Sequence, residues 1–165
     1  MRQKFAFVIV LSAIAASPAM AAGGDGPKDF VGDAIKGDNS EIALGQMAQR
    51  SGGTAAMRDF GRTLVADHTK AKQQVADVAH GLGADVPDDV MPEAKSEQAK
   101  LQSMSGADFD REFASYMVDD HKKDIDKFAK EAGMHRGPTS DLAAKQLPTL
   151  RKHLSIAQGL MKSGK

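Results

Sequence analysis

Beyond an N-terminal leader, apolar residues recur along the chain at the three- and four-residue spacing of an α-helix. No stretch alternates apolar with polar residues over the length of a β-strand. Ala, Lys, Gln, Leu and Met are plentiful, whereas β-branched and aromatic residues are sparse. The pattern therefore predicts an all-α protein and argues against a fold built on a sheet.

Glycine, proline and capping residues divide the helical pattern into five segments. Thr54 is the predicted N-cap of the second helix, Ser105 opens a Ser-x-x-Asp cap for the fourth, and Thr139 or Ser140 caps the last. Four long helices and one short crossover helix predict a four-helix bundle. The predicted helices cover about residues 29–50, 54–82, 93–104, 105–132 and 139–162.

The N-terminal leader has the features of a cleavable signal peptide. A basic start precedes an apolar run over residues 5–16, and Ala19-Met20-Ala21 has the small-x-small pattern of a cleavage site. We predict cleavage after Ala21, which leaves a helical domain over residues 22–165 in the periplasm or cell envelope. The apolar run is shorter than the roughly 20 residues that cross a bilayer, so no transmembrane segment is predicted in the mature protein. The alternative is an uncleaved anchor at the membrane surface.

Charge and composition exclude several classes of partner and site. The chain has 22 basic and 22 acidic side chains, so it has no net charge to attract nucleic acid, and none is predicted as a partner. The absence of Cys excludes disulfides, thiolate zinc sites and Cys-bound iron–sulfur clusters. No motif assigns a catalytic or cofactor-binding residue, which favours a non-enzymatic protein. No feature of the sequence sets the oligomeric state.

Each long helix has a polar residue on or beside its apolar stripe near its middle. These residues are Glu41, His68 and His121, together with His153 on the margin of the last stripe. Each lies about 12 to 14 residues from the predicted start of its helix, or roughly 20 Å at 1.5 Å per residue. A mid-helix position keeps its level whether the helix runs up or down. We therefore expect one carboxylate and three imidazoles to meet in one layer of the core.

Three histidines and a glutamate suit a divalent transition metal such as iron, zinc, copper or manganese. The alternative is a polar layer without metal, whose hydrogen bonds fix the register of the helices. Four further carboxylates lie one residue or one helical turn away from these positions. They are predicted to support the ligands or to add to them: Asp38, Asp67, Asp120 and Asp124.

Several longer runs of the sequence form a recognisable set. They are A-x-x-G-D-N-S-E-I-A-L-G-Q-M-A, M-x-D-F-G-R-T-L-V-A-D-H-T-K-A, S-G-A-D-F-D-R-E-F and L-P-T-L-R-K-H-L. Together they resemble a bacterial family of exported ferritin-like proteins of unknown function. The resemblance spans about residues 28–162 and implies a ferritin-like four-helix bundle in the cell envelope. The recurring polar positions of that family fall here on Glu41, Asp67, His68, Asp110, His121 and His153.

The resemblance implies no reaction. Di-iron carboxylate proteins of the wider ferritin-like class use Glu-x-x-His pairs, but here Val65, Val118 and Leu150 stand three residues before the histidines. Ferroxidase chemistry is therefore not predicted. We expect a bundle that binds a metal ion or small ligand in its core, in envelope stress or metal handling. The alternative is a metal-free interaction or scaffolding module of the envelope.

Overall fold

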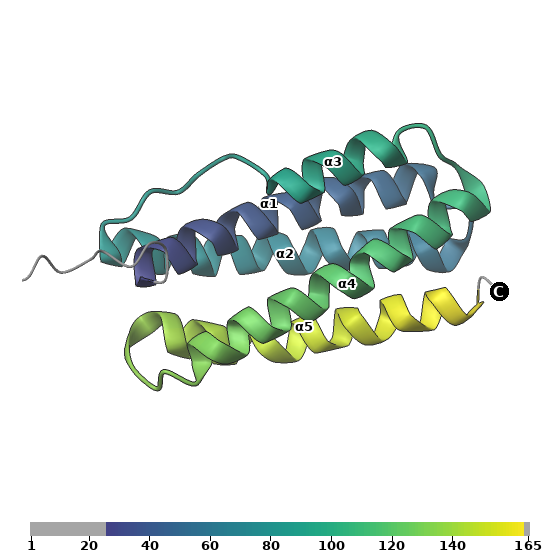
Figure 1. Ribbon diagram of the computed structural model, residues 1–165. Helices are drawn as coiled ribbons and strands as arrows, with labels where there is room; N and C mark the ends of the chain where they lie inside the picture. The colour runs from purple at the N-terminus through teal and green to yellow at the C-terminus, as the bar shows by residue number, and fades with distance from the viewer. Residues whose placement is uncertain (1–25, 164–165) are drawn as a thin grey trace, which may run out of the picture.

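The computed structural model describes residues 26–163, and its regular structure consists of five α-helices (Figure 1). They are α1 (Pro27–Ser51), α2 (Ala55–Leu82), α3 (Pro92–Leu101), α4 (Gly106–Ala132) and α5 (Gly137–Ser163). The predicted all-α four-helix bundle with a short extra helix is confirmed. None of the helices within residues 26–163 combines the length and apolar character of a membrane span. The predicted signal peptide lies outside the described residues.

Two antiparallel hairpins, α1–α2 and α4–α5, build the bundle (Figure 1). The side chain of Lys28 donates to the carbonyl of Gly83, so α1 begins where α2 ends. The backbone N–H of Gly53 donates to Asp110, so α2 and α4 begin at the same end of the molecule. The chain must therefore travel the length of the bundle between the hairpins, and the connection 83–91 together with α3 makes this crossing.

The ends of the first two helices follow their capping residues. α1 begins at Pro27, two residues before the predicted start, because a first-turn proline needs no backbone donor. Thr54 caps α2 as predicted, since its hydroxyl accepts the N–H of Met57 at 3.1 Å. Gly83 ends α2 in the left-handed region at φ 60°.

Two other predicted helix ends are wrong, and a third is right in position but lacks the predicted side-chain capping bond. α3 ends at Leu101, three residues before the predicted end. Ser105 lies at the N-cap of α4, but its side chain makes no capping hydrogen bond within the described part of the chain. Thr139 and Ser140 lie inside the first turn of α5 instead of capping it, because both hydroxyls donate to Glu131 at the end of α4.

The apolar core consists of two clusters, one on each side of the predicted polar layer. On α1 one cluster ends at Ile35 and the other begins at Leu44. On α2 one cluster ends at Leu64 and the other begins at Val75. α4 and α5 repeat this division. The polar residues therefore lie in a layer enclosed by hydrocarbon at both ends.

The backbones of α1 and α2 are in contact where two glycines face each other. A Cβ atom on Gly61 would lie 2.6 Å from the carbonyl oxygen of Gly45 and 2.9 Å from the Cβ of Ala48. A Cβ on Gly45 would lie 2.9 Å from the carbonyl oxygen of Gly61. Only glycine permits this approach, which fixes the spacing of the first hairpin.

Candidate metal centre

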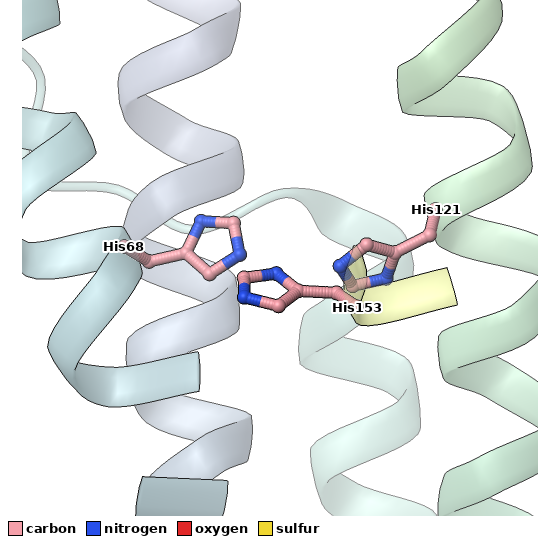
Figure 2. A group of neighbouring side chains, drawn as sticks. All are labelled: His68, His121 and His153. Atoms are coloured by element: carbon pink, nitrogen blue, oxygen red, sulfur yellow. The ribbon is translucent and has the colours of Figure 1, made fainter. Parts of the chain in front are cut away.

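Three imidazoles from three helices meet in the polar layer. His68 of α2, His121 of α4 and His153 of α5 are each exposed by 4% or less. Their ring centroids lie 5.2 Å (His68–His153), 5.3 Å (His121–His153) and 6.1 Å (His68–His121) apart. One nitrogen of each ring lies within 4.8 Å of one nitrogen of both others. Figure 2 shows the rings turned toward a shared space, so the predicted convergence of the histidines is confirmed.

Each imidazole uses one ring nitrogen in a hydrogen bond to an oxygen outside the trio. The pairs are His68 Nδ1 with Asp38 Oδ1 at 2.8 Å, His121 Nδ1 with the Met117 carbonyl at 2.9 Å, and His153 Nε2 with Asp67 Oδ2 at 2.9 Å. Because the oxygens accept, these nitrogens carry the protons and the other nitrogen of each ring keeps its lone pair. Among the described residues those other nitrogens have no hydrogen-bond partner. An outer acceptor that fixes the tautomer in this way is typical of metal-binding histidines.

Burial keeps at least two of the rings neutral. It lowers the pKa of His121 to about 3 and that of His153 to about 4, and the neighbouring imidazoles add to the effect. Burial opposes ionisation of Asp67, but hydrogen bonds from His153 and Lys152 outweigh it and lower the pKa of this carboxyl. Asp67 therefore remains an acceptor for His153 at neutral pH. A neutral imidazole is the form that coordinates metal ions.

Glu41 is buried in the same layer, but it belongs to a different group of side chains. Its Oε1 atom lies 3.8 Å from Nδ1 of His121, and one of its oxygens lies within 4.8 Å of Asp120 and His121. The structure thus divides the predicted set of four into the three histidines and a second group that shares His121. Burial raises the pKa of Glu41 well above its ordinary value, and the nearby carboxylate of Asp120 raises it further.

The other predicted carboxylates have separate positions. Asp38 is buried, and burial raises its pKa despite the hydrogen bond to His68. Asp67 points away from His68, its neighbour in sequence, and serves His153 of α5. Asp124 is half-buried, and burial followed by the charge of Asp120 raises its pKa to about 7.

A cavity of about 430 Å³ reaches the polar layer from the surface. All four long helices line it. Five of the polar side chains described above also line it: Asp38, Asp67, His68, Asp120 and Asp124. An ion can therefore approach the layer through polar surroundings.

Two polar neighbours of Glu41 have roles that sequence reasoning did not assign. The side chain of Asn39 donates to the carbonyls of Pro87 at 3.1 Å and Asp89 at 2.9 Å. The hydroxyl of Ser40 accepts the N–H of Met91 at 2.9 Å. Both contacts bind the crossover connection to α1. Four consecutive polar residues in mid-helix, residues 38–41, were the signal that this segment has several tertiary partners.

Asp110 joins the two hairpins at the end where α2 and α4 begin. Its carboxylate accepts the backbone N–H groups of Gly53 at 2.7 Å and Thr54 at 3.0 Å, and the hydroxyl of Thr54 at 2.9 Å. Asp110 lies far from the imidazoles along α4, and its hydrogen bonds connect α4 to the start of α2.

The chain belongs to the family described as Domain of unknown function (DUF4142), whose model matches residues 12–160. The search of curated proteins gives no match. Among solved structures, the chain is similar to "CopM in the Cu(II)-bound form", with a TM-score of 0.70 and 12% sequence identity. The likeness covers 84% of this chain and 97% of that chain. At this identity the comparison shows a shared helical fold and nothing about ligands.

Proposed function

We propose that this member of the DUF4142 family binds one divalent transition metal ion through His68, His121 and His153. The observation that supports the proposal is the burial and hydrogen bonding of the three rings. Each is buried and has its proton directed to an outer acceptor, and each keeps an unpartnered nitrogen in the shared space. Three unsatisfied acceptors in one buried layer are costly without a partner, and a metal ion satisfies all of them at once.

The donor set favours copper(II), with zinc next. Imidazole nitrogen is a ligand for zinc, copper, iron and nickel, and copper(II) binds most tightly in the series of divalent ions. The three-histidine group contains no carboxylate, which disfavours manganese at this position. The protein of similar fold was solved in a Cu(II)-bound form, and this supports copper(II) as the ion proposed here. Three protein ligands also leave a coordination position for water or a small ligand.

We place this metal binding in the cell envelope, where the protein would buffer or carry the ion. The support is the signal-peptide pattern of the first 21 residues together with the resemblance to an exported family. N-terminal sequencing of the protein from the periplasmic fraction tests this part, and a chain that begins at Ala22 is expected. A cytoplasmic chain that still begins at Met1 would contradict it.

Metal titration of the untagged protein tests the binding. The protein is stripped with a chelator, dialysed against copper(II) or zinc, and analysed for metal by elemental analysis. We expect one ion per chain, and at least a tenfold lower affinity in His68→Gln and His121→Gln. His80→Gln and His135→Gln are matched controls, because both residues are exposed and far from the polar layer in sequence. Equal binding by all four variants would contradict the proposal.

The second candidate function is a metal-free interaction or scaffolding module. It is favoured by the hydrogen bonds His68–Asp38 and His153–Asp67, which join α2 to α1 and to α5 and so fix helix register. Under this alternative, His68→Gln lowers stability but added metal leaves the melting temperature of both proteins unchanged. Under the metal proposal, an ion at 100 times its Kd stabilises the native protein by about 2.7 kcal/mol and the variant, which binds at least tenfold more weakly, by about 1.4 kcal/mol or less.

A further inference from the structure

Glu41 of α1 and Asp120 of α4 form a second group of candidate ligands beside His121. One carboxylate oxygen of each and one nitrogen of His121 lie within 4.8 Å of one another. Glu41 is 1% exposed, and neither of its oxygens has a hydrogen-bond partner in the described range 26–163. A carboxylate that is fully buried and unpartnered requires compensation by a proton or a cation.

Glu41 lies among other acidic side chains. Asp120, Asp124 and Asp38 act on it as like charges, which a bound cation would offset. Tyr116 is half-buried nearby, and its pKa is also raised, by burial first and then by Asp120 and Glu41. The region between α1 and α4 therefore has a negative local field that attracts positive ions.

The cavity gives an ion access to Asp120, the member of this group that lines it. Asp120 and Asp124 line it and are half-buried, so a hydrated ion entering from solvent meets carboxylate oxygens. Divalent ions that retain several bound waters need only one or two protein carboxylates. Glu41 and Asp120 provide that number.

We propose that Glu41 and Asp120 bind a second divalent cation, of the class that prefers oxygen ligands and includes Mn²⁺. Carboxylate and water ligands suit manganese, magnesium and calcium, whereas the three imidazoles suit copper and zinc. The two sites would then hold different metals on either side of His121. The proposal goes beyond the three-histidine centre and does not depend on it, because its ligands are carboxylates.

Titration with Mn²⁺, followed by the loss of the free-ion electron paramagnetic resonance signal, tests the second site. The wild-type protein and His68→Gln, which disrupts the three-histidine centre, are both expected to bind one Mn²⁺ per chain. Glu41→Gln and Asp120→Asn should each weaken binding by at least tenfold. Asp119→Asn is the matched control, because Asp119 is the exposed neighbour of Asp120 and pairs with Lys122.

Three results would overturn the proposal. They are no Mn²⁺ binding by the wild type, unchanged binding in both Glu41→Gln and Asp120→Asn, or loss of binding in His68→Gln. Loss of Mn²⁺ binding in His68→Gln would place the ion among the histidines. Copper binding, measured in the same preparations, tests the three-histidine centre separately. Asp120 is half-buried, so its amide variant keeps the fold and decides the question if Glu41→Gln does not fold.

Discussion

The contact between α1 and α2 makes a quantitative prediction for Gly61→Ala. The new Cβ would lie 2.6 Å from a backbone oxygen of α1, well inside ordinary van der Waals contact, and backbone atoms cannot rotate away. Overpacking of this kind costs about 1–3 kcal/mol, and a clash with backbone belongs at the upper end. Alanine regains up to about 1 kcal/mol through its helix propensity. We therefore expect a net loss of about 2 kcal/mol in the free energy of unfolding.

Gly32→Ala is the matched control for this substitution. Gly32 lies in α1, and a Cβ there would meet nothing within 4 Å, so the variant should gain up to about 1 kcal/mol from helix propensity alone. Urea unfolding with an unchanged m value measures both changes. The two variants should differ by about 3 kcal/mol. Equal midpoints for Gly61→Ala and Gly32→Ala would refute the close approach of the helices.

Three further predictions concern the outer partners and the effect of pH. Asp38→Asn should lower copper(II) affinity about 10- to 100-fold in dialysis, because His68 loses its carboxylate acceptor, whereas Asp33→Asn should not, because half-buried Asp33 pairs with Lys127. Between pH 7.5 and 5.5 copper(II) affinity should fall by no more than about tenfold, because the pKa values of His121 and His153 lie near 3 and 4 and protons compete only below them. If His121 and His153 had ordinary pKa values, proton competition at these two rings would lower the copper(II) affinity about 100-fold over the same range. A loss of that size in a pH series of titrations would contradict the neutral buried rings. Asp110→Ala should lower the free energy of unfolding by about 1–2 kcal/mol in urea, since three donors lose their acceptor, and an unchanged midpoint would exclude this contact as a link between the hairpins.

Sequence periodicity predicted the bundle and the polar layer because both depend on the helix repeat alone. His68 and His121 interrupt apolar stripes and His153 lies on the margin of one. All three are near the middle of helices of similar length, so their common level follows from the rise per residue. The two apolar clusters on either side of them follow from the same stripes.

Positions within the layer depend on which helices are neighbours, and the repeat contains no such information. Glu41 points inward as predicted, but α1 places it beside Asp120 and His121 and outside the trio of imidazoles. Asp67 lies 100° from His68 on α2, and the position of α5 makes it the partner of His153. The partners of Asn39 also depended on the path of the crossover connection, which no local pattern determines.

Anomalous X-ray diffraction from crystals grown with one equivalent of copper(II) tests the metal centre most directly. The account predicts one strong peak, bonded at about 2.0–2.1 Å to Nε2 of His68, Nε2 of His121 and Nδ1 of His153. Peaks confined to exposed His80 or His135, with none among the buried rings, would contradict it.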